Sequence, residues 1–235
     1  MVSLSFSHVI SLSHPIHPQI PHWPGDPRTE QTTVAEWERD GYFLRRFAMG
    51  EHSGTHVNAS RSFFPDGQAI ADYSPEQWVL PGICIDVRDR CAMDRDTQVS
   101  VADLEQWETA HGRIPAGALA IAHTGWHQKW SDPVEFLGNG DDEHELHFPG
   151  FGETATAFLM NRRQVAGIGI DTHGVDPGTS ETFEVNQQVL SANGIVAECL
   201  ARLDQLPPTG FTVVIGVLPL TGGSGSPAQL LALLP

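Results

Sequence analysis

Residues 50–64 read Gly-Glu-His-Ser-Gly-Thr-His-Val-Asn-Ala-Ser-Arg-Ser-Phe-Phe. His52 and His56 are four positions apart, and Asn58 follows two positions later. Because side chains alternate along an extended strand, every second position from 52 to 62 is predicted to share one face. Two imidazoles and an amide oxygen side by side form half of a site for a divalent ion. The alternative is a polar strand face with two hydrogen-bonded histidines.

Further fragments in the same order along the chain extend this motif. They are Trp23–Pro27, Thr124–Trp126, Phe148–Gly150, Gly169–Thr172, Asp176–Gly178 and Asn193–Leu200. Together with residues 52–59 they resemble the putative cyclase family, whose signature is His-x-Gly-Thr-His-x-Asp-Ala-Pro and which includes bacterial kynurenine formamidase and isatin hydrolase. The resemblance implies a swivelling β/β/α layered fold, often oligomeric, and hydrolysis at a metal site.

The chain departs from that family signature at several ligand positions. Asn58 stands where the family has a metal-binding Asp, and Asn186 stands where it has a His. Ser60 and Ser62 replace the Pro and His that usually follow. An amide oxygen is neutral and a poorer ligand for divalent ions than a carboxylate. We therefore expect one divalent ion, Zn²⁺ or Mn²⁺, or none, and no two-metal site.

The ligand set that the resemblance implies is His52, His56 and Glu198, with Asn58 as a weak fourth donor. Glu198 lies in the apolar segment Asn193–Leu200. A carboxylate buried in such a segment is costly unless it is paired, hydrogen-bonded or bound to a metal. This context supports a functional interpretation of Glu198 independently of the resemblance.

Composition limits the partners of the chain. Its 235 residues include 13 Lys and Arg against 29 Asp and Glu, for a formal net charge of −16. Such a surface repels nucleic acids and anionic membranes, so we expect a small-molecule substrate. The chain shows no apolar stretch of membrane-spanning length, no signal-peptide pattern and only three cysteines. We expect a cytoplasmic protein, and the resemblance implies a homo-oligomer, either a dimer or a tetramer.

Four apolar runs predict buried strands, at residues 82–87, 118–122, 165–170 and 211–217. Helical patterns cover residues 101–111, 153–163 and roughly 186–192. This alternation predicts one layered α/β domain spanning residues 1–235. Residues 1–30, rich in Pro and His, are expected to form a stiff irregular strap. The acidic run 141–143 is expected to be a solvated loop, and residues 222–227 a tight turn after the final strand.

Polar residues follow the predicted strands, where α/β sheets commonly build sites. His123 follows the second strand, and Asp171 and His173 follow the third. We consider His123 and His173 candidate catalytic bases, because Ser62 replaces the residue that the family uses. Asp171 either orients a ligand histidine or caps a turn, and the sequence does not separate the two roles.

Candidate substrate-binding residues are of two kinds. Apolar walls for a planar substrate are predicted from Trp23, Phe63, Phe64 and Trp126, each of which could instead be core packing. Polar contacts are predicted from Ser60, Ser62 and Asn186.

Three functions remain open from the sequence. The preferred one is hydrolysis or ring-opening of a small amide, lactam or formamide by metal-activated water, as in an arylformamidase. The second is a metal-independent cyclase, dehydratase or isomerase that uses a neutral polar pocket. The third is a small-molecule binder without catalysis.

Overall fold

The computed structural model describes residues 5–139 and 145–235, so the acidic run at 141–143 lies outside the described residues. Its centre is an eight-stranded sheet in the order β1-β12-β11-β5-β7-β9-β10-β4. The middle of this sheet consists of four parallel strands, β5 (Val79–Asp86), β7 (Leu119–His123), β9 (Gly167–Ile170) and β10 (Ile195–Glu198). The strands predicted near 82–87, 118–122 and 165–170 are confirmed, with bounds shifted by a few residues.

Antiparallel strands complete the sheet and close it on itself. They are β1 (His8–Ser11), β4 (His56–Asn58), β11 (Phe211–Val217) and β12 (Gly225–Leu234). The first residues of β12 pair with β4, while the rest of β12 pairs with β11 and β1. The closed sheet encloses an apolar core that includes Val57, Ile121, Val213 and Leu230.

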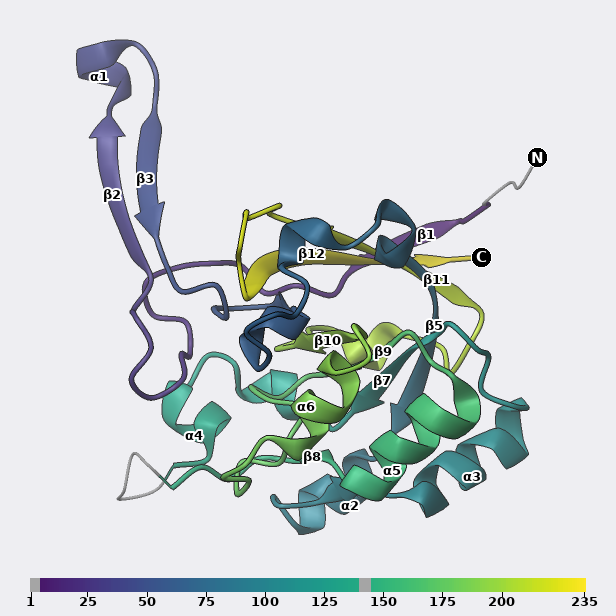
Figure 1. Ribbon diagram of the computed structural model, residues 1–235. Helices are drawn as coiled ribbons and strands as arrows, with labels where there is room; N and C mark the ends of the chain where they lie inside the picture. The colour runs from purple at the N-terminus through teal and green to yellow at the C-terminus, as the bar shows by residue number, and fades with distance from the viewer. Residues whose placement is uncertain (1–4, 140–144) are drawn as a thin grey trace.

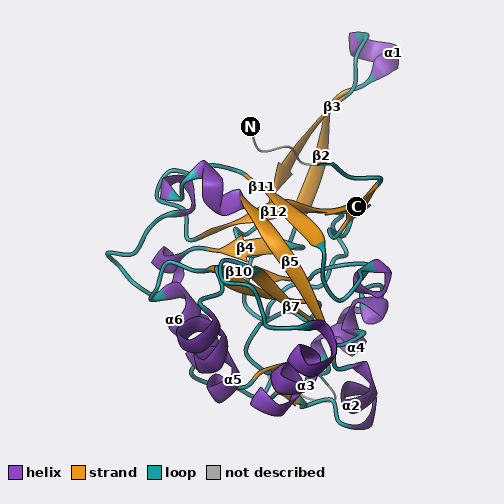
Figure 2. Cartoon of the chain, turned by 90° about the vertical axis from the view of Figure 1, so that its right-hand side faces the viewer, coloured by secondary structure: helices purple, strands orange, loops and turns teal. Residues whose placement is uncertain are grey.

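Helices cover one outer face of the parallel strands (Figures 1 and 2). They are α2 (Arg88–Met93), α3 (Val101–His111), α5 (Glu153–Ala157) and α6 (Glu184–Leu190). A second core, with Ile85, Leu104 and Leu159, lies between this layer and the sheet. The two β layers and one helical layer confirm the predicted α/β class of the swivelling β/β/α type.

The predicted helices are confirmed with one difference of type. α3 spans residues 101–111 as expected and begins with a capping box, in which the Ser100 N–H donates to Asp103 Oδ2 at 2.7 Å. α6 begins at Glu184, two residues before the expected start. The helix expected at 153–163 is α-helical only to Ala157 and continues as a π-helix over Phe158–Arg163.

Shorter elements connect these layers. They are α4 (Pro133–Leu137), the paired strands β6 (Gln98–Val99) and β8 (Gly150–Phe151), and the 3₁₀ segments η1 (Ser60–Ser62), η2 (Ile70–Asp72), η3 (Pro75–Trp78), η4 (Trp126–Lys129) and η6 (Leu203–Gln205).

The extended strand predicted from 52 to 62 is wrong over most of its length. Only His56–Asn58 form a strand, His52 lies in a turn, and residues 60–62 form η1. Gly54 has a φ of +65°, a conformation that turns the chain and that glycine adopts without a steric penalty. The alternation argument therefore holds for His56 and Asn58 alone.

Two strand regions were not predicted. β12 begins inside the Gly-Ser segment expected to be a turn after the final strand, and Leu-rich residues follow, so its pattern does not alternate clearly. β2 (Glu30–Ala35) and β3 (Leu44–Ala48) form a hairpin around α1 (Trp37–Asp40), and this hairpin projects from the body of the protein (Figure 1). Its strands are largely exposed, so their sequences lack the alternation of buried and exposed positions that predicts a strand.

The N-terminal segment enters the sheet as β1 and then runs without helix or strand from residue 12 to residue 29. Leu12 and Ile20 anchor it through buried side chains. Within the described residues, none of the helices has the length and apolar character needed to cross a bilayer.

A glycine substitution tests the close approach of β9 and β10. A Cβ added at Gly167 would lie 2.1 Å from the Ile195 carbonyl oxygen, and backbone cannot rotate away as a side chain can. We expect Gly167→Ala to lower the free energy of unfolding by about 1–3 kcal/mol in urea denaturation. Gly216→Ala on β11 is the matched control, because its nearest contact would be at 3.6 Å. Equal effects of the two substitutions would contradict the packing of β9 on β10.

His14 makes the stability depend on pH. Burial, then the nearby charges of His127 and Arg202, lower the pKa of His14 from 6.5 to about 4. Between these values the unfolded chain binds more protons, so the free energy of unfolding decreases as pH falls from 6.5 towards 4. We expect His14→Phe, which can keep the stacking on Trp130, to reduce this slope by up to about 1.4 kcal/mol per pH unit. The control His17→Phe, at an exposed position, should show the wild-type change of unfolding free energy with pH. If His14→Phe showed the same change as the wild type, the lowered pKa of His14 would be contradicted.

Candidate active site

A cavity of about 200 Å³ opens where the N-terminal segment, β4, β10 and α6 meet. The residues that line it are Trp23, Asp26, His52, His56, Asn58, Ser62, Phe63, His173, Gly174, Asp176, Pro177, Phe183, Asn186 and Glu198. The antiparallel register of β10 and β4 places Glu198 directly opposite His56. This register brings two residues 142 positions apart into one buried contact.

His56 and Glu198 are in direct contact. The ring nitrogen Nδ1 of His56 lies 2.8 Å from the Gly54 carbonyl oxygen, which only accepts, so Nδ1 carries a proton. The other nitrogen, Nε2, lies 2.9 Å from Glu198 Oε2, which is an ion pair when the ring is protonated and a contact between two acceptors when the ring is neutral. Both side chains are buried, so water does not separate the two groups.

Two amides beside this pair have their donors fully used. Asn58 Nδ2 donates to Asn186 Oδ1 at 3.0 Å and to Glu198 Oε2 at 3.1 Å. Asn186 Nδ2 donates to Asp176 Oδ2 at 3.0 Å and to Glu198 Oε1 at 3.3 Å. These contacts fix the orientation of both amides and leave Asn58 Oδ1 directed at His52.

His52 presents a second lone pair to an acceptor. Ser224 gives its hydroxyl proton to Glu51 Oε2 at 2.6 Å, because a carboxylate only accepts. His52 Nε2 therefore donates to Ser224 Oγ at 2.9 Å, and Nδ1 of the neutral ring faces Asn58 Oδ1 at 2.8 Å with its lone pair. Gly225 makes room for this ring, since a Cβ there would lie 2.7 Å from His52 Cε1.

These donor atoms suit one divalent ion. When both rings are neutral, a cation would bind the facing acceptors of His56 and Glu198 and those of His52 and Asn58. Two imidazoles with a carboxylate are a common ligand set for Zn²⁺ or Mn²⁺. Protonation of His52 is disfavoured, because burial and then the charge of His56 lower its pKa. Over the described residues, His52, His56 and Glu198 do not bring three ligand atoms within 4.8 Å of one another, so a bound ion requires a small shift of side chains.

Charge in the cavity is set by burial and by hydrogen bonds. Burial raises the pKa of Glu198, but the contact with His56 and the Val175 N–H lower it further, to about 2, so the carboxylate stays ionised. Burial and then His56 lower the pKa of His173 to about 4, so its ring is neutral near pH 7. Burial raises the pKa of Asp176 in spite of its hydrogen bonds to Asn186.

Aromatic rings form the apolar side of the cavity. The Trp23 ring lies 5.5 Å from the His173 ring and 5.9 Å from Phe183, and Phe63 lies 5.8 Å from Phe183, measured between centroids. His173 Nε2 is buried and has no hydrogen-bond partner within residues 5–139 and 145–235. The cavity thus combines flat apolar walls with a free imidazole nitrogen and a carboxylate.

Most of the residues predicted from the sequence line this cavity. They are His52, His56, Asn58, Glu198, Trp23, Ser62, Phe63, Asn186 and His173. The predicted substrate contacts Ser60, Phe64 and Trp126 do not line it. Ser60 is buried beneath it with its N–H on Tyr73 Oη, Phe64 packs against the helical layer, and Trp126 lies in a separate core with Phe136.

Two predicted catalytic residues lie elsewhere. His123 and Asp171 do not line the cavity but gather with His127 in a separate cluster. The chain bends over residues 171–173 after β9, so strand alternation does not apply there, and Asp171 and His173 lie in different surroundings although they are two positions apart. Asp171 accepts the backbone N–H groups of Thr124 and His127 and so caps the turn after β7, as one of its two predicted roles required; it also contacts His127 Nδ1.

The sequence reasoning did not assign five residues of the cavity to the site, Asp26, Gly174, Asp176, Pro177 and Phe183. Asp176 was noted only as part of an Asp-Pro-Gly fragment. Its carboxylate accepts the N–H groups of Val185 and Asn186 at the start of α6, a contact between segments that no local pattern reveals. Phe183 has a φ of +56° before α6, which is rare for an aromatic residue and invisible in the sequence.

Known proteins resemble this chain over most of its length. Isatin hydrolase of Roseibium aggregatum is 29% identical over 220 residues, covering 89% of this chain and 82% of that protein. Kynurenine formamidase of Bacillus cytotoxicus is 24% identical, with 94% of both chains covered. The structure of isatin hydrolase A from Ralstonia solanacearum superposes with a TM-score of 0.92 at 30% identity, over 97% of this chain and 92% of that one.

A further structure, an isatin hydrolase bound to the product analogue thioisatinate, superposes with a TM-score of 0.90 at 27% identity. Residues 10–177 match the sequence model described as putative cyclase, which is well over half of the chain. The chain therefore belongs to the putative cyclase family.

Proposed function

We propose that this protein hydrolyses the C–N bond of a small amide, lactam or formamide, with one divalent ion, Zn²⁺ or Mn²⁺, held by His52, His56 and Glu198 and assisted by Asn58. The observation that carries the proposal is the convergence of His52, His56, Asn58 and Glu198 on one cavity, with His56 Nε2 at 2.9 Å from Glu198 Oε2 and His52 Nδ1 at 2.8 Å from Asn58 Oδ1. Relatives named for isatin hydrolysis and kynurenine formamide hydrolysis support the reaction class.

The bound ion would supply Lewis acidity, polarising a scissile carbonyl and making water more acidic. The chain supplies the rest of the chemistry. His173, whose ring is neutral and whose Nε2 has no hydrogen-bond partner among the described residues, would accept a proton from the attacking water and return it to the leaving nitrogen. Glu198 remains an anion and balances positive charge.

The shape of the cavity favours a planar substrate. Trp23, Phe63 and Phe183 form its apolar walls, and a volume of about 200 Å³ suits a single aryl ring with a small amide substituent. Aryl formamides and fused aryl lactams fit this description.

The metal-independent alternative needs free neutral donors to stabilise an oxyanion. Asn58 and Asn186 use both of their N–H groups on Asp176, Glu198 and each other. No N–H of these two amides is left for a substrate, which disfavours this alternative. A binder without catalysis would bind aryl formamides or lactams saturably without turning them over.

We also propose a cytoplasmic homo-oligomer, a dimer or a tetramer. The projecting hairpin exposes large apolar side chains, including Trp37 at 69% and Phe47 at 60% relative exposure. Apolar area of this extent on an arm separate from the body is typical of a subunit contact. The free, buried cysteines Cys84, Cys91 and Cys199 are consistent with a reducing compartment.

Turnover of N-formyl aryl amines and aryl lactams, with and without chelator, tests the proposed function. We expect hydrolysis that chelator abolishes and that one equivalent of Zn²⁺ or Mn²⁺ restores. Turnover unaffected by chelator would support the metal-independent alternative instead.

His56→Ala removes one imidazole ligand and the partner of Glu198. We expect loss of the ion from the cavity and a fall in kcat of at least about 100-fold, while circular dichroism shows a folded protein. His111→Ala, at an exposed position on α3, is the control and should retain activity. An unchanged kcat in the His56 variant contradicts the proposed ligand set.

Asn58→Asp restores a carboxylate beside His52. We expect the Kd for Zn²⁺ to fall by about 10-fold, because a charged oxygen replaces a neutral one. The metal-free variant should be less stable than the wild type, since its carboxylate would lie against Glu198 without the two N–H bonds that Asn58 donates. Calorimetric titration and thermal denaturation measure both effects. The same Kd in both proteins would mean that position 58 does not face the ion.

A further inference from the structure

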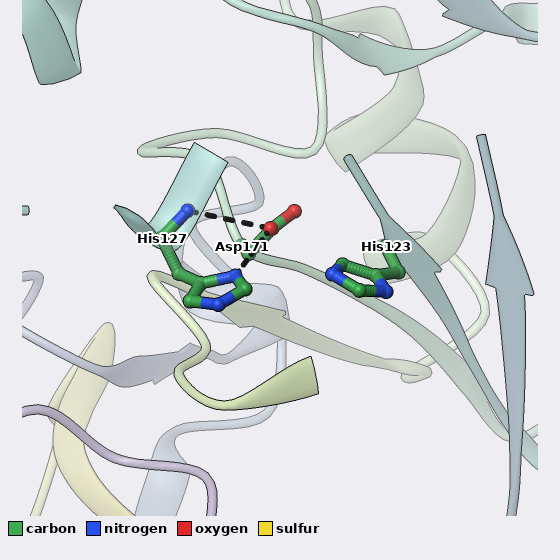
Figure 3. Close-up of side chains that lie close together, drawn as sticks. All are labelled: His123, His127 and Asp171. Atoms are coloured by element: carbon green, nitrogen blue, oxygen red, sulfur yellow. Dashed lines mark hydrogen bonds and ion pairs between the residues drawn. The ribbon is translucent and has the colours of Figure 1, made fainter. Parts of the chain in front are cut away.

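A second group of ligand-type side chains lies outside the cavity, at the carboxyl ends of two adjacent parallel strands. His123 is the last residue of β7, Asp171 follows β9 directly, and β7 pairs with β9 up to Ala122 and Ile170. His127 comes from η4, the 3₁₀ segment after β7. Figure 3 shows the His123 ring on one side of the Asp171 carboxylate and the His127 ring on the other.

These three side chains have the geometry of a ligand set. One ligand atom from each lies within 4.8 Å of the other two, and no other His, Cys, Asp or Glu trio in the described parts of the chain meets this criterion. A tetrahedral Zn²⁺ site with ligand bonds of about 2.0–2.2 Å separates its ligand atoms by about 3.4 Å. Side-chain movements of about 1 Å are therefore enough to close the group around an ion.

Hydrogen bonds pair the side chains of Asp171 and His127, but they leave a buried ring nitrogen of His123 without a partner among the described residues. Asp171 accepts the Thr124 N–H, the Thr124 hydroxyl and His127 Nδ1 at 3.0, 2.6 and 3.0 Å. His123 is 2% exposed, and its Nε2 has no partner among the described residues. An unsatisfied buried nitrogen normally costs about 1–3 kcal/mol, so the arrangement calls for a further group at this position.

The local charge favours a cation. The buried Asp171 carboxylate accepts donors from Thr124 and His127, which is the environment of an anion. Asp204 lies 3.4 Å from His127 Nε2 and adds a second negative charge. The Arg88 guanidinium, whose charge acts on His123, is paired with Asp86 at 2.6 Å.

Asp204 also lies where it could accept a hydrogen bond from the second ring nitrogen of His127. A ligand histidine usually donates its second ring N–H to a carboxylate, which fixes the tautomer that leaves the first nitrogen free for the metal. His127 has Nδ1 on the side of Asp171 and Nε2 on the side of Asp204. This is the arrangement expected if Nδ1 binds an ion and Nε2 donates to Asp204.

We propose that His123 Nε2, His127 Nδ1 and Asp171 form a second binding site for a divalent transition-metal ion, with a structural role. Two imidazoles and one carboxylate select Zn²⁺ and similar ions over Mg²⁺ and Ca²⁺. None of the three lines the cavity, so the site is separate from the one assigned to hydrolysis. Its ion would join the ends of β7 and β9 to η4 and stabilise this edge of the sheet.

The stoichiometry of Zn²⁺ on the full chain tests the proposal. After stripping with chelator and dialysis against Zn²⁺, we expect about two equivalents in the wild type and about one in His56→Ala. The double variant His56→Ala/His123→Gln should bind almost none, whereas His56→Ala/His111→Gln, altered at an exposed histidine, should bind about one. Zn²⁺ should raise the Tm of His56→Ala by about 5 °C and leave the His123 double variant unchanged.

A second substitution shows whether His127 is a metal ligand or only a hydrogen-bond partner that positions Asp171. Asn at position 127 can still donate to Asp171 but lacks the imidazole, so His127→Asn in the His56→Ala background should also lose Zn²⁺. The proposal is overturned if the His123 or His127 double variants bind as much Zn²⁺ as His56→Ala, or if His56→Ala binds none. One equivalent in the wild type that is lost with His123→Gln but not with His56→Ala would support this site while contradicting the ligand set of the cavity.

Discussion

The pairing of β10 with β4 is the constraint on which the site depends. Glu198 ends a parallel strand inside the closed sheet, where an unpaired carboxylate would be strongly unfavourable. The antiparallel register with β4 places His56 opposite this carboxylate, and the Val175 N–H with two amides satisfies its remaining lone pairs. Because β12 closes the sheet by pairing with β4, a slip of one residue in this register would turn His56 and Asn58 away from the cavity.

The buried strands and α3 could be predicted because their signals are local. Runs such as Phe211–Val217 are apolar enough to identify a buried strand, and the Ser100–Asp103 capping box marks the start of a helix. β12 was missed because it begins with glycine and serine and continues with leucines that do not alternate. The hairpin of β2 and β3 was missed because its side chains are almost all exposed, so its sequence has no alternation of apolar and polar residues that would predict a strand.

The site was predictable where the resemblance to the cyclase-family signature assigns residues, and not where contacts between distant segments decide. His52, His56, Asn58 and Glu198 do meet in one cavity, although His52 arrives from a turn and not from the predicted strand. The sequence could not show that Asp176 completes the amide network, because that contact joins the loop after β9 to the start of α6. Nor could it assign His123 and His173, which both follow buried strands, to two different clusters.

The substitution of amides for a carboxylate and an imidazole changes how much positive charge the cavity can hold. Two divalent ions need several anionic ligands, whereas among the described residues Glu198 is the carboxylate that contacts His56. Asp26 and Asp176 also line the cavity, but the Asp176 carboxylate already accepts the N–H groups of Val185 and Asn186. Asn58 and Asn186 donate N–H groups to Glu198 and so hold this carboxylate in place. Because both amides are neutral, they add no negative charge to balance a second cation. This distribution of charge favours the single ion that we propose for the cavity over a pair of ions.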